Sequence, residues 1–285
     1  MKIIKQVNES LNLVRHASFK GIVKAMAAYT AVKHYDIWIS SGKLVPPYPP
    51  NTPEKDGKIN AVKFRIKYNG KQVSITGWRF WETFLAAKEV FVEKEYDWLD
   101  VAGRKVLDLG AFTGDSAISF ALRGAAKVYT CEPNPNMISM INYNVSENGC
   151  KNKIKILHCF VGGKSSDKTE FYFDNQNMVN RSDKLKLHKL TSNIPTITLD
   201  KLVAECGITD GCLKMDIEGA EYEVIHATPL ATIKRFRQIQ IDFHKIDGKS
   251  YKTIKERLDR AGFECRVCFV GTMGGGHIDA TNTRP

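Results

Sequence analysis

The pattern of apolar and polar positions changes near residue 100. From residue 104 onward, short apolar segments of strand length alternate with segments of helical periodicity. The predicted strands cover residues 105–109, 127–131, 153–160, 212–217, 236–243, 263–270 and 276–281, and the predicted helices cover 115–123, 135–148, 199–206, 220–227 and 250–261. Only a glycine-rich link, residues 271–276, joins the last two strands, so the final strand can pair antiparallel. The sequence therefore predicts an α/β protein with a seven-stranded, Rossmann-like, doubly wound sheet and helices on both faces.

The first 97 residues have a different pattern. Apolar positions at helical spacing predict one or two amphipathic helices within Leu11–Ile39, where a packing role is favoured over a membrane-surface role. The proline-rich stretch Pro46–Pro53 predicts a stiff linker, with binding to a proline-recognising partner as the alternative. Alternation of apolar and basic residues in Val62–Tyr68, a tight turn at residues 69 and 70 and renewed alternation from Val73 predict a β-hairpin.

An aromatic cluster then opens a predicted helix that runs to about Tyr96. Its members are Trp78, Phe80, Trp81 and Phe84. We expect these rings to form the core where the N-terminal part docks, and one ring at the substrate cleft is the alternative.

The composition fits a globular protein of one large core plus an extension, since 43% of the 285 residues are hydrophobic. No run approaches the roughly 18 apolar residues of a membrane span, and Met1–Glu9 lacks the features of a secretory signal, so we expect a cytoplasmic protein. The seven cysteines are odd in number, which indicates free thiols in a reducing compartment. Cys265 and Cys268 have Cys-x-x-Cys spacing without a second pair, so zinc or redox use is the less favoured interpretation.

The formal net charge is +11, but the lysines are spread along the chain without a compact basic run. This distribution favours a solvated basic surface over a nucleic-acid groove, while an acidic substrate or a membrane surface stays open. Nucleic acid is therefore a possible partner but not the favoured one.

The most informative stretch is Val106–Asp115, where an apolar strand ends in a glycine-spaced turn and a helix follows. Gly110 and Gly114 let backbone N–H groups approach a ligand at the positive end of that helix. One helix length later the next strand delivers Glu132, at the spacing where doubly wound folds place an acid on ribose hydroxyls. The unit predicts a nucleotide-type ligand.

Two side chains shift the expected ligand from a dinucleotide to S-adenosylmethionine. Phe112 occupies the position of the glycine that lets a pyrophosphate approach, and a bulky residue there suits a ligand without phosphates. Asp108 can face the positively charged amino-acid end of S-adenosylmethionine, whereas it would repel a pyrophosphate. A capping or turn-bonding role is the alternative for Asp108.

A second group of candidate residues follows the predicted strand 212–217. Asp216 and Glu218 share one side of an extended chain at the edge of the sheet where ligands bind, and His244 ends the neighbouring strand. Asp216 can orient a hydroxyl acceptor or accept its proton, and His244 can be the base at neutral pH. The same three side chains resemble a divalent metal site, and structural roles are the alternatives. Glu221, in the first turn of the next helix, is expected to stabilise the positive helix end.

The segment Lys214–Glu221, Lys-Met-Asp-Ile-Glu-Gly-Ala-Glu, resembles the signature of the FkbM-type methyltransferase family, in the class I methyltransferase superfamily. Further matches, in family order across about residues 98 to 270, are Leu107–Ala111, Glu132–Pro135, Asn144, Thr198–Leu202 and Ile241–His244. The resemblance implies S-adenosylmethionine-dependent O-methylation, often of sugar hydroxyls on metabolites or glycans. It implies a methyltransferase domain at residues 98–285, preceded by an N-terminal extension at residues 1–97.

These arguments give a set of candidate site residues. The catalytic candidates are Asp216, Glu218 and His244, which are also the possible metal ligands. The cofactor-binding candidates are Asp108, Gly110, Ala111, Phe112, Thr113, Gly114, Glu132, Pro133, Asn134, Phe160, Val161 and Asp216. Phe112 and Thr113 depart from the family pattern. Val161 and Gly162 supply no acidic side chain for adenine, which leaves backbone or apolar contacts there.

The sequence leaves three functions open. The leading one is O-methylation of a small molecule or glycan, the second is methylation of RNA or protein through the basic surface, and the third is binding by a cofactor fold without catalysis. A methyltransferase for exocyclic amines would carry Asn-Pro-Pro-(Tyr/Phe) where Asp216–Gly219 stands, which argues for hydroxyl acceptors. The polar, basic insertion at about residues 164–195 is expected to be a mobile lid over the acceptor or a surface addition.

Overall fold

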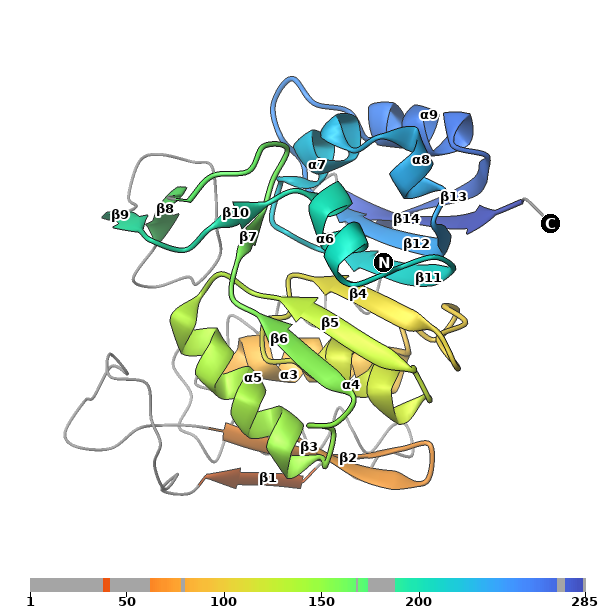
Figure 1. Ribbon diagram of the computed structural model, residues 1–285. Coiled ribbons are helices and arrows are strands. Elements are labelled where there is room, and N and C mark those ends of the chain that lie inside the picture. The colour runs from red at the N-terminus through yellow and green to blue at the C-terminus, as the bar shows by residue number, and fades with distance from the viewer. Residues whose placement is uncertain are drawn as a thin grey trace.

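A seven-stranded sheet forms the centre of the protein (Figure 1). The computed structural model describes residues 38–41, 62–77, 80–167, 169–173, 188–270 and 275–283. The strand order is β13-β14-β12-β11-β4-β5-β6, in which β14 pairs antiparallel with β12 and β13 and the pairs from β12 to β6 are parallel. The bounds are β4 (Lys105–Leu109), β5 (Lys127–Cys131), β6 (Ile154–Leu157), β11 (Gly211–Met215), β12 (Phe236–Phe243), β13 (Phe263–Val270) and β14 (Gly275–Asn282). The predicted doubly wound sheet with an antiparallel last strand is confirmed.

Helices cover both faces of the sheet (Figure 1). One face carries α4 (Asp115–Leu122) and α5 (Pro135–Glu147), and the other carries α6 (Leu199–Glu205), α7 (Glu221–Ala227), α8 (Leu230–Ile233) and α9 (Tyr251–Arg260). Because the side chains of a strand point alternately to its two faces, β4 contributes side chains to two separate hydrophobic cores. Val106 belongs to the core beneath α4 and α5, whereas Leu107 and Leu109 belong to the core beneath α6 to α9.

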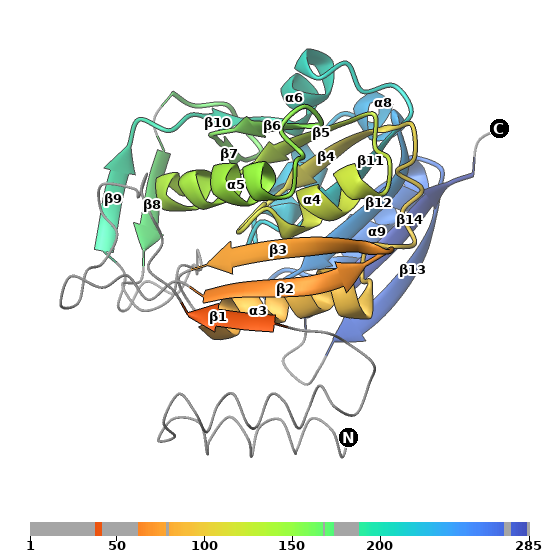
Figure 2. The same ribbon diagram turned by 90° about the horizontal axis from the view of Figure 1, so that it is seen from below.

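The predicted hairpin is confirmed as β2 (Val62–Tyr68) and β3 (Lys71–Gly77), which pack against α3 (Phe80–Lys88) and α5 (Figure 2). The buried side chain of Asn144, in α5, makes two hydrogen bonds to the backbone of β3. Its Oδ1 accepts from Thr76 N at 2.9 Å and its Nδ2 donates to Thr76 O at 2.9 Å. The same Nδ2 donates to Thr113 O in the glycine-spaced turn, also at 2.9 Å. The hairpin and the sheet face beside it share one core, across the predicted boundary at residues 97 and 98.

Two predictions on the N-terminal side are wrong in detail. Residues 38 and 39, expected at the end of a helical stretch, lie in strand β1 (Trp38–Ser41), which pairs antiparallel with β2. The helix expected to run to Tyr96 changes after α3 into a π-helical turn, η1 (Glu89–Glu93), and ends at Lys94, whose φ is +58°. The extra residue of a π-helical turn shifts the direction of the following side chains.

The insertion after β6 contains β-structure that its polar composition did not predict. The expected strand 153–160 is divided into β6 and β7 (Phe160–Val161), and β7 pairs with β10 (Thr196–Ile197). Between β7 and β10 in the sequence, β8 (Thr169–Phe173) pairs antiparallel with β9 (His188–Ser192). A lid role for this insertion stays a prediction, since residues 174–187 lie outside the described residues.

Further sequence predictions also lie outside the described residues. They concern the helices at residues 11–37, the linker Pro46–Pro53, the side chains of Trp78, Phe80 and Trp81, and the link at residues 271–274. All seven cysteines are free, as predicted. In the part of the chain that the structure describes, no helix is long and apolar enough to cross a membrane.

Candidate active site

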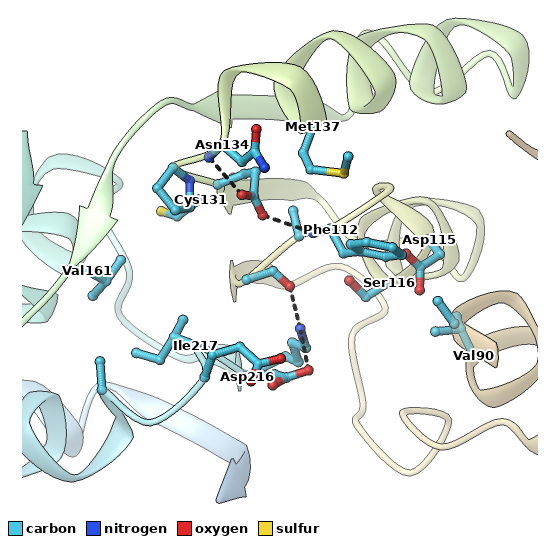
Figure 3. Close-up of a pocket in the computed structure, with 18 of the residues that line it drawn as sticks. Val90, Phe112, Asp115, Ser116, Cys131, Asn134, Met137, Val161, Asp216 and Ile217 are labelled. Carbon is cyan, nitrogen blue, oxygen red and sulfur yellow. Dashed lines mark hydrogen bonds and ion pairs between the residues drawn. The ribbon is translucent and has the colours of Figure 1, made fainter. Parts of the chain in front are cut away.

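A cavity of about 500 Å³ lies at the carboxyl ends of β4, β5 and β11 (Figure 3). This is the edge where open α/β sheets bind their ligands, and the volume suits a small organic molecule. Its wall includes the glycine-spaced turn after β4, the segment after β5 and the turn after β11, and α3 with η1 closes another side. The lining candidates from the sequence are Gly110, Ala111, Phe112, Glu132, Pro133, Asn134, Phe160, Val161, Asp216 and Glu218.

The turn after β4 is shaped by contact with the end of β11. Gly110 has φ +84°, and a Cβ atom added there would lie 1.7 Å from the backbone oxygen of Asp216. Lys214 Nζ donates to the oxygen of Gly110 at 2.6 Å and lies 3.9 Å from Asp216 Oδ2. Glycine is therefore required at residue 110 for both its conformation and its lack of a side chain. This close contact between Gly110 and the backbone of Asp216 places Asp216 next to the turn after β4, which lines the cavity.

Glu132 is fixed by two backbone donors. Its Oε2 accepts from Phe112 N at 3.1 Å and its Oε1 accepts from Asn134 N at 2.8 Å, as the dashed lines in Figure 3 show. Phe112 presents its N–H because it has φ +46°, a conformation that few non-glycine residues adopt. Burial raises the pKa of Glu132 to about 7, although both backbone donors lower it. Each carboxylate oxygen keeps a lone pair for a hydroxyl donor in the cavity.

The cavity wall beside Glu132 is mainly apolar. The residues that line it are Pro133, Met137, Phe160 and Val161, together with two cysteines, Cys131 and Cys159. Such a surface suits a flat, weakly polar ring more than a charged group. Residues 160–162 supply no acidic side chain, so adenine contacts through apolar groups or the backbone stay a prediction.

Three cofactor candidates do not line this cavity: Asp108, Thr113 and Gly114. Asp108 is fully buried beneath the turn, where its Oδ2 accepts from Ser116 Oγ at 3.0 Å and from Thr130 Oγ1 at 2.8 Å. Lys214 Nζ lies 3.7 Å from its Oδ1. Burial raises the pKa of the Asp108 carboxyl, and the Lys214 charge opposes that shift. Asp108 therefore connects β4, β5, α4 and β11 from below the site.

Several lining residues were missed by sequence reasoning. Lys214 is the only basic side chain among the described residues that line the cavity, and its signal was a lysine in an otherwise apolar strand. Asp115 opens α4 and lines the cavity, and burial raises its pKa to about 6 although Thr113 donates to it. No sequence motif indicated that residues before the methyltransferase sheet would also line the cavity. These residues are Glu82, Leu85, Ala86, Glu89, Val90 and Tyr96. Tyr96 lines the cavity, whereas Phe84 of the predicted aromatic cluster is buried in the core.

The catalytic candidates meet beside the cavity, but not on an extended strand as predicted. Strand β11 ends at Met215, and residues 216–219 form a turn in which Glu218 has φ +55°. His244 Nε2 lies 3.8 Å from Asp216 Oδ1 and 3.5 Å from Glu218 Oε2. The turn thus brings the two carboxylates to one imidazole, which is not among the groups that line the cavity.

Glu221 has a larger role than the helix-end one predicted for it. Its fully buried Oε1 accepts from Ile217 N at 3.0 Å and lies 3.2 Å from His244 Nδ1. Burial lowers the pKa of His244, but the hydrogen bond and charge of Glu221, with the charges of Glu218 and Asp216, outweigh it and raise the pKa to about 9. His244 is therefore protonated at neutral pH in the protein without ligand, in contrast to the neutral base that the sequence suggested.

The strand order, the antiparallel β14 and the cavity over the carboxyl ends of β4 and β11 define a class I methyltransferase fold. A model of the methyltransferase FkbM domain matches residues 108–265, which is more than half of the chain. The chain therefore belongs to the FkbM methyltransferase family, and it is an S-adenosylmethionine-dependent methyltransferase. No curated protein matches the sequence.

Solved structures of methyltransferases resemble the chain at low sequence identity. Methyltransferase FkbM from Methylobacillus flagellatus KT is 15% identical, with a TM-score of 0.44 over 68% of this chain and 47% of that one. Magnesium protoporphyrin IX methyltransferase from Synechocystis PCC 6803, solved with its bound S-adenosylmethionine, is 15% identical, with a TM-score of 0.43 over 73% and 86%. Precorrin-6y C5,15-methyltransferase from Geobacter metallireducens GS-15 is 12% identical, with a TM-score of 0.39 over 70% and 87%.

The buried carboxylate of Glu132 is expected to make cofactor affinity depend on pH. We expect Glu132→Gln to weaken S-adenosylhomocysteine binding by about 10–100-fold, because hydrogen bonds to a charged acceptor contribute about 1.5–3 kcal/mol each. In the unaltered protein the affinity should fall by up to about tenfold per pH unit below pH 7, since hydroxyl donors favour the ionised form and protonation competes with them.

Isothermal titration calorimetry between pH 6 and 8 measures both effects. Glu205→Gln, at an exposed position at the end of α6, is the matched control and should bind as the unaltered protein does. A Kd for Glu132→Gln that equals the control value, or that keeps the same pH dependence, would show that Glu132 does not bind the ligand.

Proposed function

We propose that the protein transfers a methyl group from S-adenosylmethionine to a hydroxyl oxygen of a neutral or positively charged acceptor, such as a sugar, a glycan or a small metabolite. The observation that carries this proposal is the position of Asp216, which lines the cavity at the end of β11 and whose Oδ1 lies 3.8 Å from His244 Nε2. A hydroxyl must lose its proton as the new bond forms, and a carboxylate at this position can accept that proton.

The residues of the cavity fit S-adenosylmethionine. In this proposal Glu132 accepts from the two ribose hydroxyls, and the apolar wall at Pro133, Phe160 and Val161 holds the adenine ring. Asp115, beside the positive end of α4, is placed for the amino group, while backbone N–H groups of the turn after Gly110 face the carboxylate. The bound molecule supplies an activated methyl group on a sulfonium sulfur. The protein aligns the acceptor with it and keeps water away.

Asp216 is the proposed proton acceptor, and His244 a positioning residue. Lys214 lies 3.9 Å from Asp216 Oδ2 and His244 lies 3.8 Å from Asp216 Oδ1, so each oxygen faces a cation. The two cations orient the carboxylate, and Glu221 fixes the imidazole from the other side. If His244 were the base instead, kcat would rise with pH up to about 9, where its imidazolium loses the proton.

The charge of the cavity disfavours RNA as the acceptor. Its acidic lining residues, among those that the structure describes, are Glu82, Glu89, Asp115, Glu132, Asp216 and Glu218, against Lys214 as the basic one. S-adenosylmethionine carries a net positive charge, which an acidic cavity attracts. The phosphates of a nucleic acid need basic partners and would be repelled at the same opening.

The same carboxylates and imidazole favour a second candidate, metal-assisted transfer. One ligand atom each from Asp216, Glu218 and His244 lies within 4.8 Å of the others, and Glu221 accepts from the far nitrogen of the imidazole. A carboxylate behind a metal-binding histidine is the usual arrangement of such sites. A hard divalent cation there would lower the pKa of the acceptor hydroxyl. Activity that is lost in EDTA and restored by Mg²⁺ or Mn²⁺ would establish this candidate, and activity unaffected by EDTA would exclude it.

A methyl-transfer screen with labelled S-adenosylmethionine tests the acceptor class. The acceptors compared are a neutral sugar, an amino sugar, the corresponding sugar phosphate, a glycan and RNA. We expect label on neutral or amino-sugar hydroxyls and at least tenfold less on the phosphorylated partner. Preferred labelling of RNA or of a sugar phosphate would overturn the proposal. Lower discrimination in a Glu82→Gln/Glu89→Gln variant would connect the preference to the acidic wall.

A further inference from the structure

A second cluster of metal-ligating side chains lies outside the cavity, on the three strands at one edge of the sheet (Figure 2). The register places Cys268 of β13 opposite His277 of β14, and His277 opposite Asp242 of β12. Asp279 follows His277 by two residues and therefore shares its face of the strand. Glu95, in the turn after η1, covers this face and approaches His277 Nδ1 to 3.8 Å.

Three of these side chains converge closely. One ligand atom each from Cys268, His277 and Asp279 lies within 4.8 Å of the others, and His277 Nε2 is 3.7 Å from Asp279 Oδ1. Arg266 Nη2 pairs with the other oxygen of Asp279, Oδ2, at 3.3 Å and leaves Oδ1 facing the cluster. A thiol, an imidazole and a carboxylate are the ligand types that zinc takes in proteins.

Unsatisfied polar atoms give an independent indication of a ligand at this place. Asp279 is 8% exposed, and its Oδ1 has no hydrogen-bond partner among the described residues. His277 Nδ1 is buried and has none either within the described part of the chain. A buried polar atom without a partner costs about 1–3 kcal/mol, so folded proteins rarely keep one without a reason. A bound cation would satisfy Asp279 directly and would orient the ring of His277.

We propose that Cys268, His277 and Asp279 bind a zinc ion, with a water molecule as the fourth ligand. The Cys268 thiol binds as the thiolate and releases its proton to solvent, and no electron is transferred. His277 binds through Nε2, and its Nδ1–H turns to the Glu95 carboxylate, which orients the ring. The site joins the edge strands β13 and β14 to the turn that follows η1, and η1 is part of the wall of the active-site cavity.

The Cys-x-x-Cys spacing does not make this site, because residues three apart on a strand face opposite sides. Cys265 lies on the other face of β13, against the core beneath α9. Cys265 is therefore a matched control: a second cysteine on the same strand, three residues away, that cannot reach His277.

Cobalt titration tests the proposal on the full chain kept reduced. Co²⁺ bound to a thiolate gives a sulfur-to-metal charge-transfer band, which the cluster at Asp216, Glu218 and His244 cannot produce because it contains no cysteine. We expect one Co²⁺ with this band, displaced by one equivalent of Zn²⁺. Cys268→Ala and His277→Ala should each weaken binding by about 100-fold or more, and Glu95→Gln by about 10–100-fold, the range for residues that orient a ligand.

The controls separate this site from the alternatives. Cys265→Ala and an Asp216→Asn/His244→Ala variant should both keep the band, and Zn²⁺ should raise the melting temperature of the Asp216→Asn/His244→Ala variant but not after Cys268→Ala is added to it. Melting curves without metal show that each variant is folded. No band in the unaltered protein, a band that persists in Cys268→Ala, or equal loss in Cys265→Ala would overturn the proposal.

Discussion

Asp216→Asn is expected to lower kcat by about 10²–10⁴-fold, the range that a positioned acid or base contributes to proton transfer. Asparagine has nearly the same shape as aspartate, so the backbone contact between residues 216 and 110 is kept and the turn after β11 is undisturbed. The amide cannot accept the proton of a hydroxyl, and it loses the attraction to Lys214 and His244. S-adenosylhomocysteine should still bind, since Glu132 and the apolar wall are unchanged.

The matched control is Asp247→Asn, in the exposed turn after β12. It removes the same charge outside the cavity lining, and its kcat should equal that of the unaltered protein. Methyl transfer is measured with the acceptor found in the screen, and cofactor binding is followed by the thermal shift with S-adenosylhomocysteine. If Asp216→Asn kept full turnover while binding the cofactor, Asp216 would not be the proton acceptor.

The methyltransferase sheet was predictable because its signals are local. Strand β4 ends where Gly110 begins, and β5 ends one residue before Glu132, so apolar runs and glycine positions give the bounds directly. The β2–β3 hairpin was predictable for the same reason, from strict alternation around an Asn-Gly turn. The β8–β9 pair has only a weak sequence signal, because the insertion as a whole is polar and basic and the strand-forming aromatic residues of β8 are confined to three positions, Phe171 to Phe173.

The orientation of individual site residues was less predictable. Asp108 precedes the turn by two residues, so the sequence placed it near the ligand, yet the alternation of β4 directs its side chain beneath α4. His244 was expected to be neutral. The sequence placed Asp216 and Glu218 near it, but nothing in the sequence indicated that the buried Glu221 would approach its other ring nitrogen. Such charges come together only through packing, which a single sequence does not show.

The wall formed by α3 and η1 had no sequence signal. Its side chains come from a segment before the methyltransferase sheet and meet residues more than 100 positions later, such as Asp216. The net charge of +11 also pointed away from the acidic cavity, because a sum over the chain does not tell where charges gather. The chain as a whole is basic, whereas the charged residues that line the cavity are mostly acidic.

Gly110→Ala is expected to have the second large effect, on both stability and cofactor binding. The new methyl group would lie 1.7 Å from the backbone oxygen of Asp216 and 2.8 Å from its carbonyl carbon, distances that only a shift of the backbone relieves. That shift would disturb the hydrogen bond from Asp216 N to Leu109 O, at 3.0 Å, and the contact of Lys214 with the turn. It would also move the N–H of Phe112 away from Glu132.

Gly103→Ala separates this steric effect from backbone strain. Gly103 has φ +71°, close to the +84° of Gly110, but a Cβ atom there meets no other atom within 4 Å. It should lose only about 1–2 kcal/mol of unfolding free energy, the cost of a left-handed conformation for an alanine. Gly110→Ala should lose about 3–5 kcal/mol, which places it among the severe single substitutions.

Urea unfolding and S-adenosylhomocysteine titration of both variants provide the measurement. We expect Gly103→Ala to bind the ligand normally and Gly110→Ala to bind at least about 100-fold more weakly, a difference of about 2.7 kcal/mol. Equal losses of stability in the two variants would mean that only the positive φ matters and that the ends of β4 and β11 can separate freely. Because the proposed proton acceptor, Asp216, and the proposed ribose-binding carboxylate, Glu132, are both positioned through that contact, we expect its rigidity to determine whether cofactor and acceptor meet in line.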